Sequence, residues 1–200
     1  MSCQAKDLGQ VREAVTLAET ARAGYPAASP RVSAILDLRA AEAYANERAT
    51  VDCRRALDSA FARLDDPGPQ HGDPAWCYWL DQAQAHAQAG YCYVTLEDWP
   101  QARRHLRAAL RLQDHEFSRE GALRNALLAT TYIRQAQPDI EQALHLGNRA
   151  VAVLSDQVRS ARCVQHVHRL VASLRPYGQN HAVRDFADNV RTLLGTPSTP

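Results

Sequence analysis

The sequence feature that most constrains the fold is a spacing of small and bulky apolar residues. Between Gln82 and Gln113 it reads Gly90-x2-Tyr93-x8-Ala102-x3-Leu106-x2-Ala109. Small residues let two helix backbones approach closely, and bulky neighbours fill the space beside the crossing. The stretch therefore predicts two antiparallel helices joined by a tight turn at Glu97-Asp98.

The same spacing recurs in register, and recurrence argues against a chance match in an alanine-rich chain. The other occurrences are Ala41-x2-Tyr44-x8-Cys53-x3-Leu57-x2-Ala60, then Ala129-x2-Tyr132 with Ala143-x3-Gly147-x2-Ala150, and Val171-x2-Leu174-x8-Val183-x3-Ala187-x2-Val190. The second of these has two residues inserted at the turn, and the third uses larger residues. A unit that recurs in this way predicts an array of helical hairpins that pack against one another.

This spacing is similar to the tetratricopeptide repeat (TPR), a helix-turn-helix unit of roughly 34 residues. The family's Trp early in the first helix and Pro at the end of the unit are replaced by His86 and Asp114. The resemblance implies an all-α, TPR-like α-solenoid of about four hairpins plus an N-terminal half-repeat, in a single domain over 1–200. The expected boundaries are 1–24 for the half-repeat, 30–64, 74–113, 116–154 and 155–195 for the hairpins, and 196–200 for a tail.

Individual residues predict where the helices begin and end. Ser29, Asp98, Asp139 and Asn180 occupy N-cap positions, and Gly195 ends the last helix. One long helix is expected over about 74–96, and another is expected to open at Ser155.

The composition is that of a soluble protein without disulfides. No apolar run is long enough to cross a bilayer, and the start has no signal-peptide pattern. We therefore expect a cytoplasmic protein. The cysteines are Cys3, Cys53, Cys77, Cys92 and Cys163, an odd number at irregular spacing, which predicts reduced residues in or near the core.

The charge balance argues against direct binding of nucleic acid. Lys and Arg number 23 against 22 Asp and Glu, so the formal net charge is +1. A free-standing nucleic-acid binder normally has a basic excess or a basic stripe. We expect neither nucleic-acid nor membrane binding by this chain.

The sequence does not predict an enzyme. Cys163-x2-His166-x-His168 has metal-ligating residue types, but on a helix His168 points away from the other two. The remaining histidines are scattered, and no Gly-rich phosphate loop follows a strand. We therefore expect no catalytic residues, no metal and no cofactor.

Aromatic residues cluster after the Pro/Gly-rich segment 65–72. Trp76, Tyr78 and Trp79 either fill the gap beside this long connection or form a recognition edge, because exposed Trp and Tyr favour interfaces. We expect Trp79 to pack toward the preceding hairpin.

The N-terminal segment matches only the second half of a repeat. Leu8-Gly9 and then Ala14-x3-Ala18-x2-Ala21 match the turn and second helix of a repeat, so Met1 would fall in the middle of the missing first helix. Either the chain is a fragment of a longer protein, which we favour because solenoid ends need capping units, or a short N-terminal helix packs alone. An apolar stripe of Leu8, Val11, Val15 and Leu17 would then be partly exposed, which predicts a possible homodimer.

In TPR arrays the first helix of each hairpin lines a concave groove. Transferring that register places a mixture of amide, hydroxyl and guanidinium groups in the groove, which suits an extended peptide or a partner helix. The predicted groove residues are Arg39, Glu42, Asn46, Gln84, Gln88, Tyr91, Thr95, Leu127, Thr130, Arg134 and Arg169. The Lys/Asn carboxylate clamp of chaperone-binding arrays is absent, since Leu38, Glu42, Ala87 and Tyr91 stand there. The alternative is a solvated face without a specific ligand.

Several stretches together resemble the C-terminal TPR region of actinobacterial transcriptional regulators with an N-terminal Xre-type helix-turn-helix. They are Asp7-Leu8-Gly9, Arg12-Glu13-Ala14-Val15, Ala28-Ser29-Pro30-Arg31-Val32, Asp73-Pro74-Ala75-Trp76, Trp79-Leu80-Asp81, Ala89-Gly90 and Val183-Arg184-Asp185-Phe186. The resemblance implies a non-enzymatic protein- or peptide-binding module, the sensory part of a regulator whose DNA-binding domain is not in this chain. A free-standing TPR adaptor with no DNA link is the alternative, and an accessory subunit of an enzyme comes third.

Overall fold

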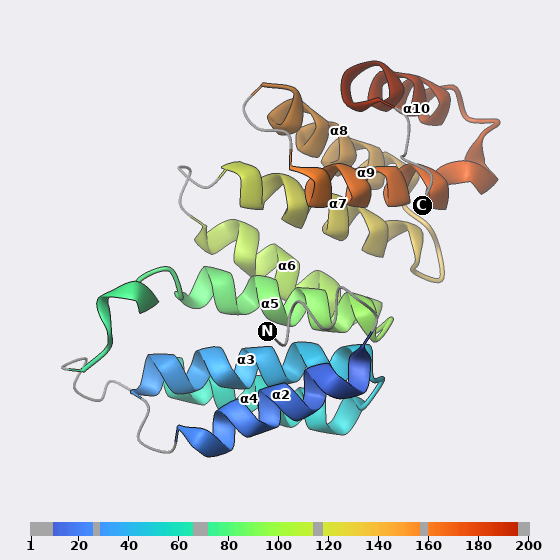
Figure 1. Ribbon diagram of the computed structural model, residues 1–200. Coiled ribbons are helices and arrows are strands. Elements are labelled where there is room, and N and C mark those ends of the chain that lie inside the picture. Colours follow the sequence, from blue (N-terminus) through green and yellow to red (C-terminus); the bar gives the residue numbers. More distant parts are fainter. Residues whose placement is uncertain (1–9, 26–28, 66–71, 114–117, 157–159, 196–200) are drawn as a thin grey trace. The chain divides into compact units, whose positions relative to one another are not determined.

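The computed structural model describes residues 10–25, 29–65, 72–113, 118–156 and 160–195, and these are helical throughout, with short connections and no strand (Figure 1). The all-α prediction is therefore confirmed for the described residues. The α-helices are α2 (Val11–Gly24), α3 (Pro30–Asn46), α4 (Thr50–Asp65), α5 (Gln82–Thr95), α6 (Trp99–Leu112), α7 (Ser118–Ile133), α8 (Ile140–Asp156), α9 (Ala161–Leu174) and α10 (His181–Leu194), with 3-10 helices η1 (Ala75–Cys77) and η2 (Arg175–Tyr177).

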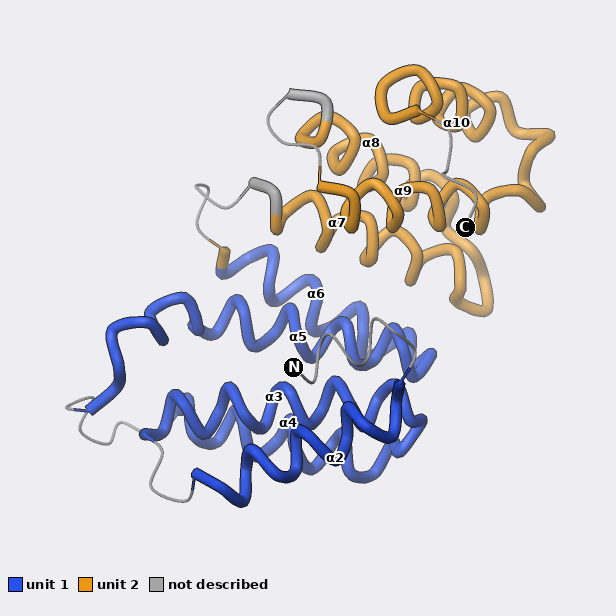
Figure 2. The backbone as a smooth tube through the Cα atoms, viewed as in Figure 1, with its two compact units in different colours: residues 1–112 blue, residues 113–200 orange. Residues whose placement is uncertain are grey.

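The chain forms two compact units, Met1–Leu112 and Gln113–Pro200 (Figure 2). In unit 1, α3 pairs with α4 and α5 pairs with α6, while α2 packs on α3 and α5 packs on both helices of the first hairpin. In unit 2, α7 pairs with α8, α9 packs on both, and α10 packs on α8 and α9. Helices that are adjacent in sequence thus pack in pairs, whereas a single solenoid over the whole chain stays a prediction.

The two hairpins of unit 1 turn in the same way. Arg48 and Glu97, 49 residues apart, both have a φ of 63°, the left-handed region that non-glycine residues rarely enter. The next residue, Ala49 or Asp98, donates its N–H to the carbonyl of Tyr44 or Tyr93 over 2.9 Å. Corresponding residues of the repeated pattern therefore occupy corresponding places in the two turns.

The α7–α8 turn closes with the same hydrogen bond, although it is longer. Asp139 N–H donates to the carbonyl of Tyr132 over 3.1 Å, and Tyr132 is the third tyrosine of the repeated pattern. The two extra residues lie inside the loop that this bond closes, and α7 and α8 still pack as a pair.

Small residues lie where paired helices approach each other most closely. In unit 1, Gly90 of α5 lies against α6, and a Cβ at Gly90 would lie 2.7 Å from Cγ and Cδ2 of Leu106. Ala102, Leu106 and Ala109 of α6 are fully buried beside it. In unit 2, a Cβ at Gly147 of α8 would lie 2.8 Å from the Phe186 ring of α10, a close contact between helices outside the α7–α8 pair. The pattern that predicted hairpins is therefore a pattern of close helix contacts.

Most of the predicted helix ends are confirmed. The side chains of Ser29, Asp98, Asp139 and Asn180 each accept a hydrogen bond from a backbone N–H of the first helical turn, and Gly195 follows α10 with a φ of 82°. Capping satisfies N–H groups that have no partner within the helix.

Two predicted helices were wrong. A helix over 74–96 was expected, but residues 75–77 form only η1, and α5 begins at Gln82 because the Asp81 carboxylate accepts from Gln84 N–H over 2.7 Å. A helix was also expected to open at Ser155. Instead, α8 continues to Asp156, and the next described helix begins at Ala161.

The N-terminal helix is packed against its own chain. Ala14 and Ala18 of α2 are buried, and Val15 and Leu17 pack against the core of unit 1. Leu8 lies outside the described residues, so the homodimer stays a prediction, with less of its apolar stripe exposed than expected. Among the described residues, no helix combines the length and the apolar character needed to span a membrane.

Substituting Gly90 with Leu should destabilise the chain strongly, because the new side chain would overlap Leu106. Overpacking a core typically costs about 1–3 kcal/mol. Ala102→Leu should act in the same direction. Gly24→Leu is the matched control, since a Cβ at Gly24 meets nothing within 4 Å. Thermal melts followed by circular dichroism measure the effect, and equal melting temperatures for Gly90→Leu and wild type would contradict the close crossing.

Candidate functional site

Unit 1 contains seven of the predicted groove residues, on two helices that pack against each other. On α3, Arg39 Nη1 forms an ion pair with Glu42 Oε2 at 3.2 Å, and Asn46 Nδ2 donates to the Glu42 carbonyl over 2.7 Å. Glu42 is largely buried, whereas Arg39 and Asn46 are half-buried. Glu42 therefore contacts Arg39 through its carboxylate and Asn46 through its backbone carbonyl, and both of these side chains remain partly exposed.

The α5 residues follow the same arrangement. Gln84, Tyr91 and Thr95 are half-buried, and Thr95 Oγ1 donates to the Tyr91 carbonyl over 3.0 Å. Gln88 is only 9% exposed, and its Oε1 has no hydrogen-bond partner among the described residues. Gln84, Gln88, Tyr91 and Thr95 are spaced three or four residues apart, so their amide and hydroxyl groups lie along one side of α5.

The other four groove residues belong to unit 2. Leu127 is buried in the core, and Thr130 Oγ1 donates to the Ala126 carbonyl over 3.0 Å. Arg134, just after α7, and Arg169 of α9 are exposed, and α7 packs on α9. The predicted residues are thus divided between the two units, and a groove lined by either set stays a prediction.

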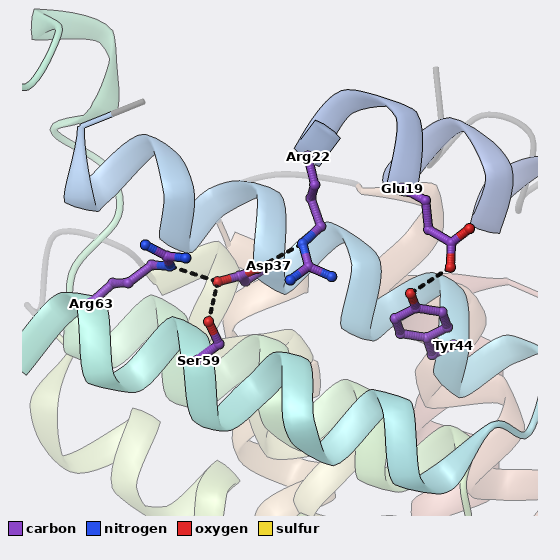
Figure 3. A network of polar contacts seen from close by, with 6 residues as sticks. All are labelled: Glu19, Arg22, Asp37, Tyr44, Ser59 and Arg63. Carbon is purple, nitrogen blue, oxygen red and sulfur yellow. Dashed lines mark hydrogen bonds and ion pairs between the residues drawn. The ribbon is translucent and has the colours of Figure 1, made fainter. Parts of the chain in front are cut away.

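A buried carboxylate that the sequence analysis did not single out joins three helices of unit 1 (Figure 3). Asp37 of α3 has a side chain only 2% exposed. Its Oδ1 accepts from Arg22 Nε of α2 at 2.9 Å, and its Oδ2 accepts from Arg63 Nε at 2.9 Å and Ser59 Oγ at 2.6 Å, both on α4. Burial of a charge is tolerated because both oxygens are paired and hydrogen-bonded.

A second polar contact attaches α2 to α3. Tyr44 Oη donates to Glu19 Oε1 over 2.7 Å (Figure 3). Burial, and then the hydrogen bond to the Glu19 carboxylate, raise the pKa of Tyr44. The buried residues of α2 are only Ala14 and Ala18, so these two contacts add directional attachment to the small apolar contacts of the helix. The only signal for Asp37 in the sequence is an acidic residue among the apolar positions of α3.

Asp37→Asn should lower the free energy of unfolding by about 1–3 kcal/mol, the range for losing a charged hydrogen-bond partner in a buried site. Asp58→Asn is the matched control. Asp58 is exposed on the same helical hairpin, and such surface changes are usually within about 0.5 kcal/mol. Urea denaturation measures both. Equal midpoints for the two variants would show that the Asp37 network does not stabilise the fold.

A pair of histidines faces each other between α5 and α6. The Nδ1 atoms of His86 and His105 lie 3.0 Å apart, and both rings contact Phe61 of α4. The Tyr93 ring also contacts His105. One Nδ1 must donate and the other must accept, so the ring that accepts must be neutral, with its proton on Nε2.

The surroundings of the histidine pair keep it neutral. Burial, followed by the charges of His86 and Arg104, lowers the pKa of His105 to about 4. Burial and the guanidinium groups of Arg104 and Arg111 lower the pKa of His86. Together with Phe61 and Tyr93, the two histidines form a packed cluster of rings between α4, α5 and α6.

The described cysteines, Cys53, Cys77, Cys92 and Cys163, are free and buried, as predicted, and Cys3 lies outside the described residues. A hydrogen bond from Cys92 is the main cause that lowers the pKa of Cys53. Within the described parts of the chain, no three His, Cys, Asp or Glu side chains converge as a metal site would require.

The aromatic residues after the long connection divide into two kinds. Trp79 packs against the core of unit 1, as predicted. Cys77 and Leu80, which are close to it in the sequence, are buried. Trp76 is 56% exposed and Tyr78 is 78% exposed. The segment is thus anchored by Cys77, Trp79 and Leu80, whereas the aromatic side chains of Trp76 and Tyr78 are exposed.

Comparison with protein-family models, with curated proteins and with solved structures found no match to this chain.

Acidification should destabilise the fold through His105. Its pKa is lowered in the folded state, so the unfolded chain binds the proton more tightly, and stability falls as the pH drops from about 6.5 toward 4. The His105→Gln variant should lose less stability over this interval than wild type. His145→Gln, at an exposed position of α8, is the control and should follow wild type. Melting temperatures across the pH range that fall in parallel for all three chains would contradict the assignment.

Proposed function

We propose that this chain is a TPR-like array of helical hairpins that binds a protein or peptide without catalysing a reaction. Support for the repeat comes from the turns of α3–α4 and α5–α6, which share a left-handed residue and a closing hydrogen bond at the same register. Further support comes from the close contact between α5 and α6 at Gly90. Repeats of this kind commonly expose one helix of each hairpin to ligands.

One observation supports the binding face most directly: α3 packs on α5, so their polar side chains belong to one unit. Arg39, Gln84 and Tyr91 are half-buried and offer a guanidinium, an amide and a phenol. An extended peptide or partner helix has backbone and side-chain polar groups that such side chains can pair with. The phenol also supplies apolar contact area, and tyrosine is frequent among residues that dominate binding energy.

The regulatory role is proposed on the resemblance to Xre-type regulators alone. In that setting the ligand would favour one arrangement of the hairpins or one dimer state, and a DNA-binding domain outside these residues would respond to the shift in populations. A cytoplasmic location accompanies this proposal. The alternative, a free-standing adaptor, shares the same binding face and differs only in what the bound partner controls.

Site-specific photo-crosslinking tests the binding face. A benzophenone amino acid placed at Tyr91 should capture a discrete partner in cells of the source organism, whereas the same group at Ala62, exposed on α4, should not. With the captured partner in hand, Tyr91→Ala should weaken its affinity about tenfold, the typical effect of removing a tyrosine that dominates an interface.

Two results would contradict the proposal. The first is equal capture at Tyr91 and Ala62, and the second is an affinity that Tyr91→Ala leaves unchanged. Circular dichroism of the Tyr91→Ala chain ensures that a lower affinity does not reflect unfolding.

A further inference from the structure

Two of the buried cysteines lie on helices of neighbouring hairpins. Cys53 belongs to α4 and Cys92 to α5, and α4 packs on α5 within unit 1. The two residues are 0% and 1% exposed, and both belong to the core cluster of unit 1. The other described cysteines lie elsewhere, Cys77 on η1 outside this cluster and Cys163 on α9 of unit 2. A pair of thiols is thus enclosed between the two hairpins of unit 1.

The side chains of Cys53 and Cys92 contact each other directly. The Cys92 thiol donates a hydrogen bond to the Cys53 sulfur, so the two sulfur atoms face each other across the contact between α4 and α5. A disulfide joins cysteines whose side chains point toward each other, with Cβ atoms about 3.5–4.5 Å apart. Hydrogen-bonded thiols already point toward each other, so bond formation needs a shorter distance between the sulfurs and no new partner.

The surroundings of Cys53 favour its thiolate form. The hydrogen bond from Cys92 is the largest cause that lowers the pKa of Cys53; burial opposes it, and the positive charge of Arg54 adds to the lowering. By contrast, burial and then the charge of Asp73 raise the pKa of Cys77. The thiolate is the form that attacks an oxidant. Cys53 is therefore the nucleophile of the pair, and Cys92 is positioned to complete the disulfide.

We propose that Cys53 and Cys92 are a redox-active pair, which a hydroperoxide oxidises to a disulfide between α4 and α5. The Cys53 thiolate attacks one peroxide oxygen, so an S–O bond forms, the O–O bond breaks, and hydroxide or alkoxide leaves. The Cys92 thiol then attacks the sulfenic sulfur. The S–S bond forms, the S–O bond breaks, and the sulfenic OH leaves as water with the Cys92 proton. The two sulfurs lose two electrons, which reduce the peroxide.

Burial of the pair determines how the oxidant reaches it. Buried cysteines are usually inert, because an oxidant must contact the sulfur. Here α4 and α5 pack most extensively on their own hairpin partners, α3 and α6, and their contact with each other is smaller. A local separation of the hairpins therefore requires less free energy than global unfolding. Once formed and enclosed again, the disulfide is sheltered from reductants for the same reason.

Oxidation has a defined mechanical consequence, which does not rest on the proposed binding function. The disulfide ties the hairpin that contains α3 to the hairpin that contains α5, so the two can no longer separate. It also closes a loop of about 40 residues, which restricts the unfolded chain. We expect the oxidised chain to melt about 5–10 °C above the reduced chain.

The test treats the full chain with hydrogen peroxide at neutral pH, blocks the remaining thiols and maps peptides by mass spectrometry without reductant. Two peptides joined through Cys53 and Cys92 should appear. In Cys92→Ala this crosslink cannot form, and dimedone, which traps sulfenic acids, should label Cys53. Cys77→Ala is the matched control, because it also removes a buried thiol of unit 1, and its Cys53–Cys92 crosslink should form at the wild-type rate.

Three results would overturn the proposal. The first is the absence of the Cys53–Cys92 crosslink, or crosslinking of Cys53 to Cys77 to the same extent. The second is a crosslink that forms no faster than global unfolding, measured by hydrogen exchange of the slowest amides, because the pair would then be closed in the folded chain. The third is an oxidised chain that melts below the reduced one. Circular dichroism verifies that each variant is folded before peroxide is added.

Discussion

The close approach of paired helices is the constraint on which each unit depends. Where α5 meets α6, the Leu106 side chain occupies the space that a Cβ of Gly90 would need. The absence of a side chain at Gly90 therefore allows the short distance between the two helices. Alanines at the neighbouring positions extend this close contact. Interiors packed in this way tolerate little added volume, because surrounding atoms have few voids into which they can move.

Helix α2 is attached by a different kind of interaction. Its buried apolar residues are small, and its direction relative to the first hairpin is set by Arg22 on Asp37 and Glu19 on Tyr44 (Figure 3). Polar pairs are directional, whereas alanine contacts are not, so the buried carboxylate selects one arrangement of three helices from several of similar apolar burial. Helix α3, which has part of the proposed binding face, belongs to this framework.

The sequence predicted the helices and their pairing well, because small residues at a fixed spacing allow two helices to pack closely. It predicted most helix ends for the same reason, since Asp98 or Asn180 can satisfy a helical N–H only at a cap. It failed at residues 74–81, where Asp81 offered a cap as strong as the expected one. The Asp37 network and the histidine pair were missed because each joins residues far apart in the chain.

The left-handed residues Arg48 and Glu97 have a consequence for how this chain can vary. A non-glycine residue in this conformation costs on the order of 1 kcal/mol, whereas the exposed ion pair that the two side chains form at 3.0 Å is worth at most about that much. Glycine or asparagine at either turn would relieve the backbone cost without entering the core. Substitutions at the two turns should thus change the free energy of unfolding little, whereas substitutions at the adjoining helix crossings should lower it.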